Sequence, residues 1–183
     1  MQIHQLSISH DEVHDRLLVR LNTQDAQEYR FWLTRRMALR LLPALNQSVL
    51  RLEAAQPGVA ASDSRAQQIL ADIQRDAFLQ TADFTTPYDA QAQRLPLGAE
   101  PMLVTDVQLS LQTNGSLEVV FQQKLGESVQ SCHLNLQASL VHGLIHLAQE
   151  TLVKADWEMA AQPKSIGHES TPKLTMDPTV YKH

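Results

Sequence analysis

The chain has few of the residues that mark specialised chemistry or a crosslinked fold. A single cysteine, Cys132, rules out an internal disulfide, and only six glycines occur, scattered singly. Without a glycine-rich run the chain has neither a phosphate-binding P-loop nor a dinucleotide-binding fingerprint, and the GxSxG turn of serine hydrolases is also missing. We therefore expect no cofactor and a protein that is not an enzyme.

Long apolar runs and an excess of basic charge are also absent. No stretch approaches the roughly 18 consecutive apolar residues that cross a bilayer, and the start MQIHQLSISH lacks the basic and apolar regions of a secretory signal. The 183 residues carry a net charge of −5, with 43% hydrophobic and 19% charged residues, which is typical of globular proteins. These features lead us to expect a cytoplasmic protein with no membrane partner.

The first 55 residues predict three strands followed by a helix. Alternating apolar residues predict strands at 3–9, 16–22 and 29–33. Thr34 then fits a helix N-cap, and apolar residues at helical spacing continue to about residue 54. Pro43 lies inside this helical pattern, where it removes a backbone hydrogen bond, so we expect a kink or a break there.

The second half of the chain has the same order of patterns. Strands are predicted at 107–111, 117–121 and 132–136, followed by a helix at 138–159. The dipeptide Asn114-Gly115 predicts a tight type I′ hairpin turn between the first two strands. The sequence QLS occurs near the start of both halves, and a shift of 103 residues places Leu6 on Leu109 and Leu33 on Leu136.

These patterns predict the α+β class, with two β-β-β-α repeats related by pseudo-two-fold symmetry. The expected architecture is one antiparallel sheet, or two, backed by two long helices, with a helical insert between the repeats. A single duplicated domain, 1–160, would contain repeat one (1–55), the insert and a loop (56–101) and repeat two (102–160), followed by a weakly ordered tail (161–183). In the insert, Ile69, Leu70 and Ile73 predict an apolar helix face that packs on the main body.

Arginine and tryptophan side chains are predicted on the solvent face of the first repeat. The candidate residues for binding nucleic acid or another anion are Arg16, Arg20, Arg30, Trp32, Arg36 and Arg40. Arginine pairs with phosphate, and tryptophan stacks on bases, as single-stranded nucleic-acid platforms require. Tandem units of strands followed by a helix are also similar in layout to the Whirly and purine-rich-element-binding proteins, and this resemblance implies nucleic-acid binding.

Histidines at helical spacing are the first hint of a metal site. His142, His146 and Glu150 follow one another at one-turn intervals on the second long helix, and two such imidazoles can reach one ion. No further ligand is fixed by spacing and HExxH is missing, so we expect a solvated helix face and no metal. The same expectation holds for a looser set, His10, Asp11 and His14. Cys132 alternates with leucines, which predicts a buried, unreactive thiol.

We therefore expect a non-enzymatic interaction or scaffold protein that binds a protein partner or a second copy of itself through its edge strands. The alternative is a single-stranded nucleic-acid-binding protein that uses the arginine and tryptophan face.

Overall fold

The described residues, 2–55, 63–89 and 94–157 of this computed structural model, form two β-sheets and three helices. The first sheet has the order β1-β2-β3-β4 and contains β1 (Ile3–Asp11), β2 (Arg16–Thr23), β3 (Glu28–Thr34) and β4 (Met102–Leu103). The second has the order β5-β6-β7 and contains β5 (Asp106–Leu111), β6 (Leu117–Leu125) and β7 (Ser128–Leu136). The helices are α1 (Arg35–Ala54), α2 (Ser64–Thr81) and α3 (Ala138–Lys154). Neighbouring strands are antiparallel, except for the parallel pair β3 and β4.

The predicted strands and helices are confirmed, and the protein has the predicted mixture of helices and sheets. Leu17, Val19 and Leu21 alternate along β2 and are all buried, as a strand with one covered face requires. The hydroxyl of Thr34 caps α1 by accepting a hydrogen bond of 3.2 Å from the backbone N–H of Met37. The predicted tail, 161–183, lies outside the described residues.

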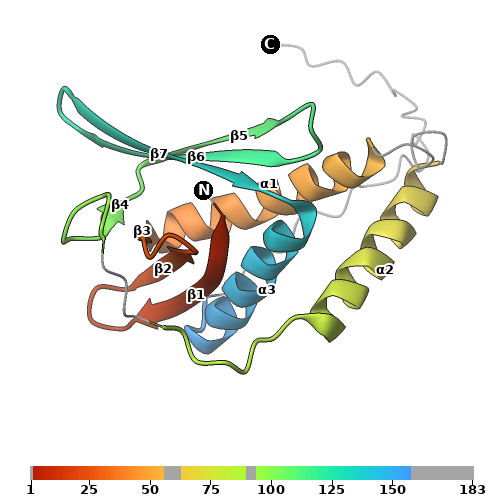
Figure 1. Ribbon diagram of the computed structural model, residues 1–183, viewed down its shortest axis with the longest axis horizontal. Coiled ribbons are helices and arrows are strands. Elements are labelled where there is room, and N and C mark those ends of the chain that lie inside the picture. Colours follow the sequence, from red (N-terminus) through yellow and green to blue (C-terminus); the bar gives the residue numbers. More distant parts are fainter. Residues whose placement is uncertain (1, 56–62, 90–93, 158–183) are drawn as a thin grey trace, which may run out of the picture.

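The two sheets are separate but share one hydrophobic core with α1 and α3. Phe31 of β3 and Phe121 of β6 meet in this core, with their ring centroids 4.8 Å apart. Figure 1 shows the second sheet across the top of the molecule, with α1 and α3 below it and α2 at the right. Neither sheet could bury its apolar face alone, so the halves of the chain stabilise each other.

The turn at Asn114-Gly115 is not of type I′, which needs a positive φ at both residues. Gly115 has φ of 76°, but Asn114 is not among the residues with positive φ. The backbone N–H of Gly115 donates to the carbonyl of Gln112 (3.1 Å), and the N–H of Gln112 donates to the carbonyl of Ser116 (2.8 Å). The side chain of Asn114 accepts from the N–H and hydroxyl of Ser116, which favours this wider turn.

The predicted break at Pro43 does not occur, because α1 is continuous from Arg35 to Ala54. Leu41, Leu42 and Leu45 flank the proline and are all buried. Tertiary packing of this face supplies most of the stability of such a helix, and it outweighs the loss of one backbone hydrogen bond.

The predicted docking face of α2 is also wrong. Ile69, Leu70 and Ile73 are exposed, whereas Ala71 is buried. Phe78 lies against α3, with its ring 3.5 Å from the position of a Cβ at Gly143. The small side chain of Ala71 and the bare glycine allow a close approach that branched residues would prevent.

Candidate functional site

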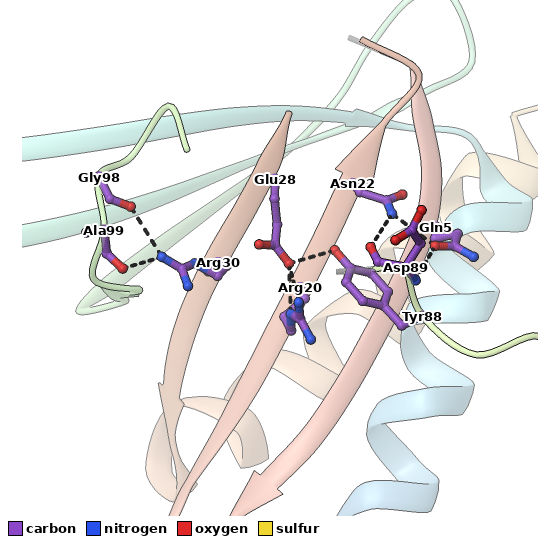
Figure 2. Close-up of polar contacts among 9 residues, drawn as sticks. All are labelled: Gln5, Arg20, Asn22, Glu28, Arg30, Tyr88, Asp89, Gly98 and Ala99. Carbon is purple, nitrogen blue, oxygen red and sulfur yellow. Dashed lines mark hydrogen bonds and ion pairs between the residues drawn. The ribbon is translucent and has the colours of Figure 1, made fainter. Parts of the chain in front are cut away.

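Segment 83–89, which follows α2, crosses the outer face of the first sheet and is fixed there by polar contacts (Figure 2). The buried carboxylate of Glu28 is central: Nη2 of Arg20 lies 2.7 Å from its Oε1, and the hydroxyl of Tyr88 donates to the same oxygen at 3.0 Å. The guanidinium of Arg20 also lies 4.3 Å from the centroid of the Tyr88 ring. Burial, and then the charge of Glu28, raise the pKa of Tyr88, so the phenol stays protonated and donates.

A second set of contacts fixes the end of this segment beside β1. Nδ2 of Asn22 donates to Oε1 of Gln5 (2.9 Å) and to the carbonyl of Asp89 (3.1 Å), and the backbone N–H of Asp89 donates to the same Gln5 oxygen (2.9 Å). Neighbouring strands thus hold the segment from two sides, as Figure 2 shows. The chain at Tyr88 and Asp89 is part of the fold rather than a loose loop.

An open groove of about 530 Å³ lies between β1 and segment 83–89. One wall is formed by His4 to Ile8 and the other by Asp83 to Tyr88, and Leu147 of α3 completes the lining. The volume lies within the range of roughly 300–1,000 Å³ that is usual for binding sites. The lining mixes aliphatic and aromatic side chains with hydroxyl groups, so the groove suits a ligand with both apolar and hydrogen-bonding parts.

The far wall of the groove is a rigid turn centred on Asp83. Its carboxylate accepts four hydrogen bonds from the backbone N–H groups and hydroxyls of Thr85 and Thr86. These bonds, led by the one from the Thr86 hydroxyl, lower the pKa of Asp83 well below its ordinary value. Phe84 lies against His146 of α3, with the ring centroids 4.8 Å apart and the ring planes tilted by 53°. This wall is therefore held by the hydrogen bonds within its turn and by the contact of Phe84 with α3.

The near wall of the groove is β1, an edge strand with which no further strand of the described residues pairs. β1 is the outermost strand, so every second residue turns its backbone N–H and C=O away from β2. The carbonyl of Ile8 is one of these groups, because it accepts a hydrogen bond of 3.3 Å from the hydroxyl of Thr151 on α3. By the same alternation Leu6 also turns its N–H and C=O away from β2.

The arginines predicted on the outer face of the first sheet are largely engaged in contacts within the chain. Arg20 pairs with Glu28, as described above. Arg30 donates to the carbonyls of Gly98 (3.5 Å) and Ala99. Both contacts appear in Figure 2. Their guanidinium groups thus position the segments that cross the sheet.

Of the remaining candidates for anion binding, Arg16 and Trp32 share the outer face of the sheet with Arg20 and Arg30 in the strand register, whereas Arg36 and Arg40 do not. Trp32 is partly buried between Leu18 of β2 and Leu103 of β4 in the strand register, and Arg16 is partly buried at the start of β2. Arg36 and Arg40 are exposed, but they lie on α1. That helix packs on the opposite, inner face of the sheet.

The three residues of the histidine hypothesis on α3 are not placed around a common centre. His142 was expected on a solvated face, but it is buried, and its Nε2 lies 2.7 Å from Oε1 of Glu53 on α1. His146 instead pairs with Glu150 at 3.5 Å. The expectation was wrong for His142 because α1 crosses α3 there, and a helical pattern does not reveal which neighbour covers its polar positions.

In the turn between β1 and β2, each of the two histidines likewise pairs with a different carboxylate. Nε2 of His10 lies 3.3 Å from Asp15, and Nδ1 of His14 lies 3.1 Å from Asp11. The backbone N–H of His14, bonded to the same carboxylate, lowers the pKa of Asp11. Within residues 2–55, 63–89 and 94–157, no group of three or more His, Cys, Asp or Glu is arranged to hold a metal ion.

Cys132 lies in the core as predicted, 6% exposed. Burial raises the pKa of its thiol to about 11, which keeps it in the unreactive protonated form.

Sequence reasoning missed the residues that build the groove. Gln5 lies in a predicted strand, but nothing in the sequence linked it to Asn22 or to Asp89. Tyr88 lies in a stretch, TTPYDA, with no period. The one available signal was an aromatic residue in a proline-containing crossing segment, next to a sheet whose outer face carries Glu28.

Comparisons with protein-family models, curated proteins and solved structures gave no match. Among the described helices, none is both long and apolar enough to cross a membrane.

Proposed function

We propose that this is a non-enzymatic interaction protein that binds an extended segment of another polypeptide along the edge of β1. The observation that supports this most directly is the open groove of about 530 Å³ beside β1, which is an edge strand among the residues that the structure describes. Strand addition to a sheet edge is a common mode of peptide recognition, in which main-chain hydrogen bonds give affinity and side-chain contacts give specificity.

The dimensions and lining of the groove fit such a ligand. The wall from His4 to Ile8 corresponds to about 16 Å of strand at about 3.3 Å per residue, so it accommodates roughly five residues. Leu6 offers one outward N–H and C=O pair for main-chain pairing. The hydroxyls of Thr85 and Thr86 already bond to Asp83, and Phe84 and Leu147 offer apolar contacts to the ligand's side chains.

The titratable side chains in the lining suit binding better than catalysis. They are His4, Asp83 and Tyr88. Asp83 is saturated with hydrogen bonds, and the Tyr88 hydroxyl is committed to Glu28, so neither is available as the partner of a general acid or base.

The test is to select peptides from a phage-displayed library on the whole protein and to map where they bind. We expect selected peptides to protect the amides of β1 from hydrogen exchange and to lose at least tenfold in affinity when alternate peptide nitrogens are methylated. Leu147→Trp should block the groove and abolish binding. Val153→Trp is the matched control, because Val153 lies on the same helix and is 80% exposed. Peptides that bind equally well to the Leu147→Trp protein would refute the proposal.

We also propose that the two β-β-β-α halves are structural repeats with pseudo-two-fold symmetry. The contacts of the long helices support this, because α3 packs against β1 and α1 packs against β5, so each helix lies on the first strand of the other half. The helices also begin at equivalent places, directly after β3 at Arg35 and one residue after β7 at Ala138.

The strand pairings refine this correspondence. Leu17 pairs with Leu33 and Leu117 with Leu136, which matches the two middle strands and the two third strands. For the first strands, this register gives a different correspondence from the QLS alignment. Ile8 pairs with Val19, and Leu109 pairs with Val119. Leu109 therefore corresponds to Ile8 and not to Leu6. In this arrangement the halves differ most at the groove, which segment 83–89 forms on β1 alone.

The alternative, single-stranded nucleic-acid binding through the arginine face, has less support. It needs free guanidinium groups beside an open aromatic ring, and Arg20 and Arg30 are bound to Glu28 and to backbone carbonyls.

A further inference from the structure

Helix α2 turns an apolar stripe toward solvent. Ile69, Leu70 and Ile73 are 52%, 37% and 58% exposed, and they lie on one side of the helix at the spacing of a helical face. The opposite side carries the buried Ala71 and the contact of Phe78 with α3. Single exposed apolar residues are ordinary, but three adjacent large ones on one helix indicate a contact surface.

The charges beside this stripe are arranged for pairing with a copy of the same helix. Arg65 and Asp76 lie along the same edge of the stripe, near its two ends. Arg65 is exposed and makes no ion pair with any described residue. Asp76 contacts Arg75 through Oδ1 alone, which leaves its other oxygen available.

We propose that α2 pairs with α2 of a second copy, antiparallel about a two-fold axis near Leu70. In this arrangement Ile69 faces Ile73 of the second copy, and each Arg65 faces Asp76 across the axis. A two-fold interface uses one surface twice and must therefore be complementary to itself. The stripe meets this requirement in both its apolar residues and its charges, since reversing the helix direction brings Arg65 opposite Asp76.

The contact involves one helix from each chain, so the dimer is weaker than a standard interface, which buries about 800 Å² per partner. We expect a monomer–dimer equilibrium in the micromolar range, which depends on protein concentration. This surface is separate from the groove along β1, so each proposal stands if the other fails.

The test is sedimentation velocity of the full chain from low micromolar to several hundred micromolar. Wild type should shift toward twice the monomer mass as the concentration rises, and Ile73→Lys should remain monomeric. Gln68→Lys adds the same charge at an exposed position on the other side of α2 and is the matched control. Circular dichroism of each variant verifies that the fold is retained.

Charge reversal tests the proposed geometry itself. Arg65→Asp and Asp76→Arg should each weaken dimerisation at least about tenfold, because like charges then face each other. The double variant should recover the wild-type dissociation constant. A protein that stays monomeric at every concentration, a dimer that survives Ile73→Lys, or the absence of recovery in the double variant would each overturn the proposal.

Discussion

Nε2 of His142 lies 2.7 Å from Oε1 of Glu53, and this contact joins α3 to α1 across 89 residues of sequence. Both residues are buried, at 6% and 4% exposure, and Oε2 of Glu53 has no hydrogen-bond partner among the described residues. A buried polar pair of this kind adds little net stability, but removing one member leaves the other without its partner in an apolar environment.

Substitutions at this pair should therefore be strongly non-additive. Glu53→Leu or His142→Leu alone should lower the free energy of unfolding by about 3 kcal/mol or more, whereas the double variant should recover most of that loss. Urea denaturation of the four proteins measures this. His146→Leu on the same helix is the control, because His146 is only partly buried. Additive losses would show that the two residues act separately.

The contact between Tyr88 and Glu28 predicts a change in stability at alkaline pH. The pKa of Tyr88 is raised above its ordinary value of 10.0, by burial first and then by Glu28. A raised folded-state pKa gives stability that is complete below the unfolded-state pKa and is lost as the pH rises toward the folded-state pKa. We expect the stability of the wild type to decline above about pH 10.

Tyr88→Phe should remove this part of the alkaline decline and should cost about 1.5 kcal/mol at neutral pH, where the hydrogen bond to the carboxylate is lost. Unfolding curves at pH 7 and above pH 10 measure both effects. Tyr29→Phe is the control for the loss at neutral pH only, because the hydroxyl of Tyr29 bonds to the neutral side chain of Gln27 but burial raises the pKa of Tyr29 as well. An unchanged pH dependence in Tyr88→Phe would contradict the assignment.

The strand faces were predictable from sequence, and the groove was not. Leu17, Val19 and Leu21 follow a period of two, which is a local property of the backbone. The contact of Tyr88 with Glu28 joins residues 60 positions apart, and it depends on where an aperiodic segment runs. On α2 the pattern offered two faces, the large one at Ile69 and Ile73 and the small one at Ala71. The side with Ala71 also carries Phe78, which packs beside Gly143 of α3, and predicting this contact requires knowledge of the neighbouring helix.

The turn at Gly115 predicts a cost that arises from the backbone alone. Its φ is 76°, and a Cβ added there would meet no atom within 4 Å. Gly115→Ala should therefore destabilise the protein by about 1 kcal/mol through left-handed strain without a steric clash. Gly115→Asn should cost less, because asparagine tolerates this region better. Thermal unfolding compares the three proteins, and equal stability of the alanine variant would disprove the turn geometry.

The buried thiol of Cys132 predicts low chemical reactivity in the folded protein. Burial raises its pKa from 9.0 to about 11, so the reactive thiolate is about 100-fold scarcer near pH 8 than in the unfolded chain. Iodoacetamide should modify the native protein at least 100-fold more slowly than the urea-denatured protein, as measured by mass spectrometry. Equal alkylation rates in the native and denatured states would place Cys132 outside the core.

The raised pKa of Cys132 also means that stability declines as the pH rises from 9 toward 11. In Cys132→Ser that decline should be smaller.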